Sequence, residues 1–346
     1  MIGKNRIAVL LFCLGALHLV AIFAGFFSPY DFAQQDRSIP YAPPSRLHFK
    51  DAQGTMHWRP SVCLLFEHPG TFGVYDEDLQ KCFPLRFIVR GSKYKLLGLF
   101  ESTWHLFGVS APARVLLMGT DSYGRDVFSR LLYGSQVSLL AGLLATALSL
   151  GLGALLGIVA GYYGGWIDAV VMRCGELFLA LPWLYLLFAL RAFLPLHINS
   201  GQAFLLVIAV IGAIGWARPA RLIRGVVLSG KESHCVLAAR LFGGSDLYVM
   251  RRHILPQTHS ILLTQAALLI PQYILAEVTL SFLGLGVGEP APSWGNMLAS
   301  LQQYSVLVSY WWMWAPGLVL IPVFLGYMLL ASAAQDEEQR VPRCAV

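Results

Sequence analysis

Long apolar stretches constrain this 346-residue chain more than any other feature of its sequence. A helix needs about 20 apolar residues to cross a hydrocarbon core about 30 Å thick, and about six segments qualify. Only 13% of the residues are charged, roughly half the fraction usual in soluble domains, so lipid surrounds much of the surface. The sequence therefore predicts an all-α polytopic membrane protein. The segments run from Ile7 to Phe27, Val137 to Ala160, Met172 to Leu196, Ala203 to Ala217, Ile261 to Phe282 and Trp312 to Ala334.

The first apolar segment has two interpretations, a cleaved secretory signal or a permanent membrane anchor. Lys4 and Arg6 precede it, as basic residues precede both. The apolar part of a signal peptide is usually about 7 to 15 residues long and ends at a small-residue cleavage site. This segment is longer and ends at Phe26-Phe27-Ser28-Pro29. We therefore favour the anchor and assign it residues 1–30.

Positive charge near the membrane ends predicts the orientation. Lys4 and Arg6 place the N-terminus in the cytoplasm, and an even number of spans returns the tail, residues 336–346, to the same side. Arginines between spans four and five agree with this topology. The basic residues between spans one and two are weak evidence against it, because long loops translocate regardless of charge. The net charge of +6 is thus explained by a multi-pass inner-membrane protein, without a nucleic-acid partner.

Residues 31–117 form a polar region too long for a simple connection between two helices. We expect a small extracytoplasmic insertion, α+β or mainly β. The stretch from Cys82 to Arg90 mixes apolar and charged residues as a half-buried strand does, and Pro84 would confine it to a sheet edge. Cys63 and Cys82 would face an oxidising compartment, so they form either a disulfide, worth about 3 kcal/mol, or two free buried thiols.

The cytoplasmic segment at about 223–256 is longer than most connections between spans. Its stretch from Val236 to Phe242 suits a short amphipathic helix that ends at Gly243-Gly244. Such an exposed helix can insert into a cleft of a partner protein; the alternative is an ordinary surface helix between two spans.

An Ala-Ala pair, a Gly four residues after the second Ala, and a terminal Leu-Pro make this segment resemble the "EAA" loop of permeases from binding-protein-dependent ABC importers. In that family the loop docks on the ATPase subunit. Leu237 departs from the family pattern, which usually has Glu there, so the resemblance does not extend to the charge-assisted contact of that Glu. The resemblance implies ATPase coupling by Val236, Leu237, Ala238, Ala239, Arg240, Gly243, Leu255 and Pro256.

Further motifs resemble the C-type permease subunit of dipeptide and oligopeptide ABC importers. They lie at residues 119–130, 161–165, 281–286 and 292–297, and the resemblance covers Met118 to the C-terminus plus the first span. It implies the type I ABC importer fold, with a permease core at 118–335 that holds five of the spans. The implied partners are ABC ATPase subunits, a second homologous permease, an extracytoplasmic solute-binding protein and a peptide substrate. No cofactor is implied.

Two questions stay open after this resemblance. Close relatives of the peptide permeases carry nickel or another small solute, so the substrate has an alternative. The linker at 31–117 is shorter in typical members, so this insertion either shapes docking of the binding protein or serves folding stability.

Two sets of charged residues are candidates for the translocation path. Asp121, Arg125, Asp126 and Arg130 lie at helical spacings before span two, where they form either a gate or a structural network. Glu277 lies inside span five, and an intramembrane carboxylate is costly enough to indicate function. It either meets the amine of a peptide or makes a hydrogen bond between helices.

The sequence lacks the Gly-x-x-x-x-Gly-Lys-Ser/Thr phosphate loop, so we expect ATP hydrolysis on a separate subunit. No metal-ligand spacing and no nucleophile with its base is recognisable. A membrane enzyme has no need of the Ala-Ala helix, and a membrane scaffold or receptor has no need of an ATPase. Both are therefore weaker hypotheses than a permease.

Overall fold

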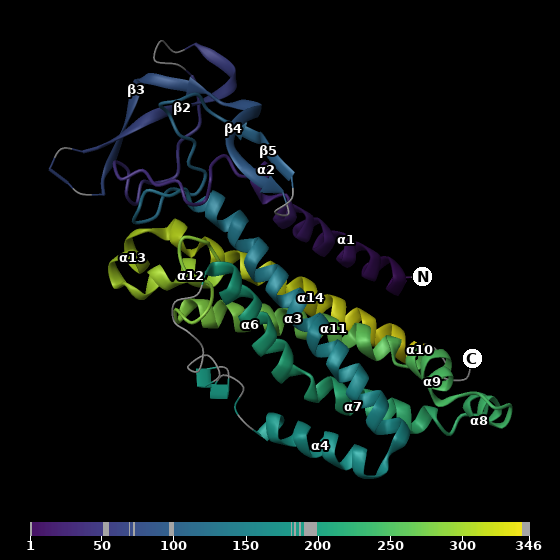
Figure 1. Cartoon of the computed structure of the whole chain (residues 1–346). Coiled ribbons are helices and arrows are strands. Elements are labelled where there is room, and N and C mark those ends of the chain that lie inside the picture. Colours follow the sequence, from purple (N-terminus) through teal and green to yellow (C-terminus); the bar gives the residue numbers. More distant parts are fainter. Residues whose placement is uncertain are drawn as a thin grey trace. The chain divides into compact units, whose positions relative to one another are not determined.

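Figure 1 shows the computed structural model, which describes residues 2–340 except 51–54, 69, 72, 97–99, 181, 183–184, 187 and 190–198. The chain forms two compact units. The helical unit contains Met1–Leu14, Leu140–Glu277 and Pro322–Val346, and the β-containing unit contains Gly15–Leu139 and Val278–Ile321. The helices α1 (Ile2–Ile22), α3 (Val127–Tyr163), α11 (His259–Phe282) and α14 (Ala315–Arg340) have residues in both.

Three helical stretches in the described residues are long and apolar enough to cross a membrane: α3, α11 and Trp311–Asp336. The pair α6 (Ser200–Gly215) and α7 (Ala217–Gly230) meets the same test as one span with a bend of 42°. In α1 the apolar part is Arg6–Ile22. The predicted third span begins in α4 (Gly165–Ala180), and part of it lies outside the described residues. The protein is thus a helical membrane protein, and the count of six spans stays a prediction.

Two boundaries differ from the sequence-based expectation. The helix of the second span begins at Val127, well before Val137, because the polar residues that precede the apolar stretch still suit a helix. The fourth helical region does not end at Ala217: after the bend at Trp216 it continues to Gly230. The first part of the predicted cytoplasmic segment is therefore the end of a long helix.

Close packing of α3 on α7 depends on three glycines at four-residue spacing, Gly153, Gly157 and Gly161. A Cβ on Gly157 would lie 2.6 Å from the carbonyl oxygen of Ala220, and one on Gly161 would lie 2.8 Å from Cβ of Val227. Small residues let the backbones of two membrane helices approach closely. The glycine row therefore fixes α3 against α7.

The remaining helical elements of the helical unit follow α7. The short helix α8 (His234–Leu241) is followed by α9 (Asp246–Val249), a π-helical turn (Met250–Ile254) and α10 (Leu255–Gln257). In the β-containing unit, α2 (Ala24–Phe27) follows α1, and α12 (Trp294–Ala299), a 3₁₀ turn (Ser300–Gln302), α13 (Tyr304–Ser309) and a second 3₁₀ turn (Trp311–Trp314) precede α14.

The polar region between α2 and α3 consists mainly of β-strands. An antiparallel sheet in the order β1-β2-β3 comprises β1 (His48–Lys50), β2 (Met56–Glu67) and β3 (Tyr75–Pro84), and a two-stranded antiparallel sheet comprises β4 (Arg86–Leu96) and β5 (Phe100–Gly108). The mainly β alternative thus matches the secondary structure. The side of the membrane on which this region lies stays a prediction.

The single strand predicted from Cys82 to Arg90 is wrong. Pro84 is the last residue of β3, and the buried Leu85 separates it from β4. A proline has no N–H to donate to a strand ladder, so it favours the end of a strand. Leu85 instead donates its backbone N–H to the carbonyl oxygen of Pro60 and packs with Val62 and Val115.

Cys63 and Cys82 are joined by a disulfide in the β-containing unit. They are direct partners in the pairing of β2 with β3, and the register shifts between Cys63 and Leu64. Of the two alternatives left open by the sequence, the structure has the disulfide.

Candidate functional sites

The helix α8 ends at glycines that form two backbone hydrogen bonds. The N–H of Gly243 donates to the carbonyl oxygen of Arg240 at 3.0 Å, and the N–H of Gly244 donates to that of Ala239 at 2.9 Å. This is the Schellman arrangement of a helix C-terminus, which needs a left-handed residue. Gly243 supplies it with φ of 81°, so the Gly-Gly ending is required by the backbone.

One face of α8 is anchored in the helical unit. Val236 is fully buried in an apolar cluster. Next to it, the hydroxyl of Tyr162 donates a hydrogen bond to Asp246 at 2.6 Å, and the guanidinium of Arg240 lies 4.8 Å from the centre of the Tyr162 ring. Because α8 is packed on these residues, a displacement of α8 would also displace the ends of α3 and α7. The other buried members of the cluster are Tyr162, Ile223, Val227, Val249 and Ile254.

The helices α8 and α9, labelled in Figure 1, also carry large exposed apolar side chains, which we call the coupling surface. Leu241 and Phe242 are 87% and 92% exposed, far more than apolar side chains in a core. A contiguous patch of this kind marks an interaction surface. The coupling surface consists of Leu237, Leu241, Phe242, Leu247 and Tyr248.

The other residues predicted to couple to an ATPase lie at several depths. Ala238 and Arg240 are exposed, and Ala239 is half-buried against the apolar cluster. Leu255 and Pro256 are exposed and form α10, after the π-helical turn. Leu237 belongs to the coupling surface itself, where its apolar side chain is 45% exposed.

Three of the four charged residues predicted before span two form one ion-pair cluster in the β-containing unit. The Nε–H of Arg125 donates to Asp121 Oδ2 at 2.7 Å, and Arg130 Nε lies 3.7 Å from the same oxygen. Glu289 closes the cluster: it accepts from Arg125 Nη1 at 2.6 Å and from Arg130 Nη2 at 2.9 Å. Burial lowers the pKa of Arg125, but Asp121 and Glu289 outweigh that effect and raise it.

Asp126 does not join this cluster and instead caps α3. Its Oδ2 accepts hydrogen bonds from the backbone N–H of Ser129 at 2.8 Å and from the hydroxyl of Ser129 at 2.5 Å. Asp126 is 2% exposed, and burial raises the pKa of its carboxyl to about 6. A residue predicted as a charged gate partner therefore serves the start of a helix.

Glu277 belongs to the helical unit, where its side chain is fully buried in α11. On the turn before it, the hydroxyl of Tyr273 lies 2.9 Å from the hydroxyl of Ser149 on α3. This places Glu277 on a helix packed inside the unit. The two sequence-based hypotheses, a substrate contact and a hydrogen bond between helices, both stay predictions.

Sequence reasoning missed Glu289 as the partner of Arg125 and Arg130. It lies 164 and 159 positions from them, so no local spacing links them. One signal was available: Glu289 is the only charged residue between Glu277 and Asp336. Within the described part of the chain, no group of three or more His, Cys, Asp or Glu side chains is placed to hold a metal ion.

A comparison with known protein families identifies the family of this chain. Residues 153–336, more than half of the chain, match the family model of the binding-protein-dependent transport system inner membrane component. The chain belongs to this family. Residues 3–44 also match the N-terminal transmembrane domain of oligopeptide transport permease C. This inner membrane component is therefore a transport protein of the membrane, and its family is not one of ATPases.

Individual relatives of this inner membrane component extend the comparison. The dipeptide transport system permease protein DppC of Bacillus subtilis (strain 168) is 36% identical over 219 residues, which cover 63% of this chain and 66% of the relative. A putative peptide transport system permease protein of Brucella suis biovar 1 (strain 1330) is 40% identical over 220 residues, which cover 64% and 72%. The match thus spans slightly less than two thirds of the Bacillus relative.

Among solved structures, the crystal structure of an amino acid ABC transporter with histidines is similar over 61% of this chain and 94% of that chain. Its sequence is 17% identical, and the TM-score is 0.41.

Proposed function

We propose that this chain is one of two permease subunits of an ATP-driven importer for di- or oligopeptides, which an extracytoplasmic binding protein delivers. Its family is shown, and the relatives described above are named as dipeptide or peptide permeases. The match of residues 3–44 to the N-terminal domain of an oligopeptide permease supports the C-type subunit. These names favour peptides over nickel as the substrate class.

The coupling surface carries this proposal. An ATPase subunit binds the exposed side chains of Leu241 and Phe242, while the buried Val236 fixes α8 to the rest of the helical unit. When ATP draws the ATPase subunits together, they move α8 and with it the ends of α3 and α7. Since Leu237 replaces the Glu usual in the family, this contact is apolar rather than charge-assisted.

The ion-pair cluster has a second role in the proposal, at the extracytoplasmic end of the path. It ties the segment around Glu289 to the start of α3 through Arg125 and Arg130. Both arginines are nearly buried, and a charge pair removed from water is costly to break. The cluster therefore holds this end of the helix in a fixed position while the ion pairs are formed.

Co-purification in mild detergent tests the coupling surface. Wild-type chain should recover an ATPase and a second permease, and Phe242→Ser should lose the ATPase while retaining the second permease. Glu232→Ser is the matched control, because Glu232 is also exposed beside α8 but lies outside the coupling surface. Loss of the ATPase with both variants, or with neither, would contradict the proposal.

Uptake by intact cells tests the substrate class. Cells that express the complete importer should accumulate a labelled dipeptide, and cells with the Phe242→Ser chain should accumulate much less. A second measurement uses nickel in place of the dipeptide. Uptake of nickel without dipeptide uptake would replace the peptide assignment and leave the permease assignment in place.

A further inference from the structure

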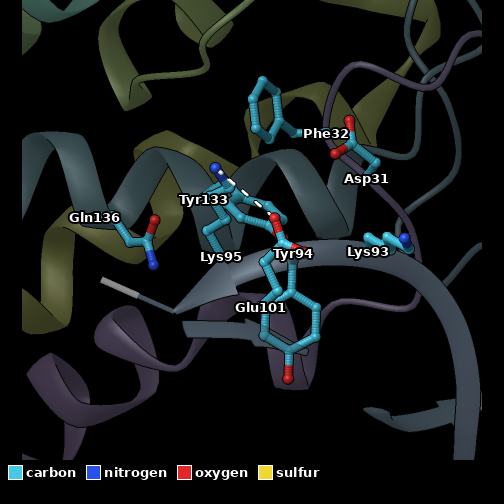
Figure 2. A pocket seen from close by; sticks show the side chains of 8 residues that line it. All are labelled: Asp31, Phe32, Lys93, Tyr94, Lys95, Glu101, Tyr133 and Gln136. Carbon is cyan, nitrogen blue, oxygen red and sulfur yellow. Dashed lines mark ion pairs between the residues drawn. The ribbon is translucent and has the colours of Figure 1, made fainter. Parts of the chain in front are cut away.

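A half-open cleft of about 360 Å³ lies in the β-containing unit, and none of the four ion-pair cluster residues lines it (Figure 2). Aromatic rings and charged groups of both signs line it. Lys93 and Lys95 come from β4 and Glu101 comes from β5, while Asp31 precedes the strands and Tyr133 lies on the first turns of α3. Such a mixture suits a ligand that is itself part apolar and part charged.

The cleft lies where apolar helices give way to polar strands. Gln136 of α3, which also lines the cleft, donates its side-chain N–H to the carbonyl oxygen of Ile22 at 3.1 Å and so joins α3 to the end of α1. The rings of Phe32 and Tyr133 meet edge to face at 5.0 Å. Amphipathic aromatic residues gather at the boundary between hydrocarbon and water. The cleft is therefore at the level of lipid head groups.

The positive and negative charges that line the cleft are equal in number, and only two of the four charged side chains pair with each other. Lys95 and Glu101 face each other at 3.9 Å, as Figure 2 shows, and both are about two-thirds exposed. Asp31 Oδ1 accepts the backbone N–H of Ala33 at 2.7 Å. Across the described residues, Lys93 has no ion-pair partner and Asp31 has no cationic one. One ammonium and one carboxylate thus remain available to a ligand.

We propose that this cleft binds the head group of a phospholipid that carries both a phosphate and a primary ammonium, as phosphatidylethanolamine does. Lys93, supported by Lys95 two positions along the same strand face, binds the phosphate. Asp31 accepts hydrogen bonds from the ammonium. A lining with two lysines and two carboxylates has no net charge, which favours a zwitterionic head group over an anionic one.

The acyl chains of this lipid lie along the end of α1. Leu19 and Phe23, on either side of Ile22, are 56% and 39% exposed. They offer apolar surface next to the Gln136 contact. A small hydrophilic zwitterion, such as glycerophosphoethanolamine or dialanine, has no long apolar group that would use this surface. The position of the cleft therefore favours a lipid as the source of the head group.

Native mass spectrometry of the full chain in detergent tests the proposal with three short-chain lipids. We expect dioctanoyl phosphatidylethanolamine to bind about tenfold more tightly than the phosphatidylcholine or phosphatidylglycerol of the same chain length, since a charge-assisted hydrogen bond is lost in each case. Lys93→Gln should weaken binding of all three lipids, because each of them carries the phosphate. Asp31→Asn should remove this preference, because Asp31 is the acceptor for the ammonium. The amide oxygen of the introduced asparagine can still accept the N–H of Ala33, so the local turn is kept.

Lys81→Gln is the matched control, because Lys81 lies on β3 and pairs with Asp78 at 3.4 Å instead of lining the cleft. Binding by this variant should equal that of wild type. Equal binding of the three lipids, tightest binding of phosphatidylglycerol, an unchanged preference in Asp31→Asn, or unchanged lipid affinity in Lys93→Gln would overturn the proposal. Displacement of the lipid by glycerophosphoethanolamine or dialanine at the same concentration would overturn the lipid as the source.

Discussion

At the scale of single residues, Glu289 is the side chain on which the ion-pair cluster depends most. It is 49% exposed, but the side chains of Arg125 and Arg130 that it binds are 7% and 3% exposed. When its charge is removed, Asp121 is the one carboxylate that remains for both arginines. Removal of one partner of a buried pair is costly because the other charge stays out of water.

We therefore expect Glu289→Gln to lower the free energy of unfolding by about 1–2 kcal/mol, a value reduced for the exposure of Glu289 itself. Glu176→Gln is the control: Glu176 is 48% exposed and pairs with Arg173, but that arginine is 82% exposed. Loss of the Glu176 charge should change the free energy of unfolding by less than about 0.5 kcal/mol. Denaturant unfolding in detergent measures both, and equal effects would show that burial of the arginines does not matter.

The burial of Asp126 predicts that its contribution to folding stability changes with pH in the opposite direction to that of an ordinary ion-paired carboxylate. Its pKa is raised by burial from 3.8 to about 6, so the folded protein favours the protonated form. This contribution to stability is complete below pH 3.8 and is lost as the pH rises through about 6. An asparagine at this position stays neutral and can still accept the N–H of Ser129.

Asp126→Asn should therefore gain stability relative to wild type as the pH rises from 4 to 7, by on the order of 2 kcal/mol. Thermal unfolding of both proteins across this range measures the difference, and other carboxylates cancel in the comparison. A difference that stays constant with pH would mean that the Asp126 carboxyl is ionised throughout.

At the scale of helices and strands, the sequence predicted those features that depend on the length of apolar segments and on local residue spacing. The helix from Val236 and its glycine ending follow from short-range chemistry, so they could be predicted. The end of the strand at Pro84 had a local signal in the missing N–H, but that signal suits an edge strand equally well. The bend at Trp216 also had a local signal, because Pro219 has no N–H to donate to the carbonyl oxygen of Gly215, but apolar length alone did not use it.

The glycine row of α3 makes a prediction about helix packing. A Cβ at Gly157 would lie 2.6 Å from a backbone carbonyl oxygen of α7, which has no rotamer by which to move away. Gly151 is on the same helix and has nothing within 4 Å of its added Cβ. Ala replaces Gly in both variants, so the change in helix propensity is the same.

We expect Gly157→Ala to destabilise the protein by about 1–3 kcal/mol through overpacking. Gly151→Ala should be neutral or slightly stabilising, by up to about 1 kcal/mol. Melting temperatures in the same detergent separate the two variants. Similar melting temperatures would show that α3 and α7 can move apart without cost.

At the scale of the whole molecule, a candidate site could be predicted when its residues lie close together in the sequence and not when they lie far apart. The coupling surface lies within one short stretch, and the sequence predicted the exposed helix that carries part of it; its coupling role stays a prediction. The ion-pair cluster needed Glu289, which long-range folding brings to Arg125 and Arg130. Asp126 has the same residue type and a similar spacing to Asp121, yet one caps a helix and the other pairs with arginine. Both side chains are buried, so the partners that the fold brings to them separate these roles.

The two cysteine environments of the molecule give a test of its predicted orientation. Cys63 and Cys82 form a disulfide, which persists in an oxidising compartment. Cys235 is free and exposed on α8, beside the coupling surface that the proposed ATPase would reach from the cytoplasm. The predicted topology therefore places the disulfide and Cys235 on opposite sides of the membrane.

A chain with Cys13, Cys174 and Cys344 replaced by Ser isolates these groups. A membrane-impermeant maleimide should label Cys235 in inside-out vesicles but not in spheroplasts, and the additional variant Cys235→Ser should abolish that signal. In spheroplasts, Cys63 and Cys82 should be labelled only after reduction. Labelling of Cys235 from outside would invert the orientation, and the coupling surface would then face away from ATP, so the same result would also remove the basis for an ATPase partner.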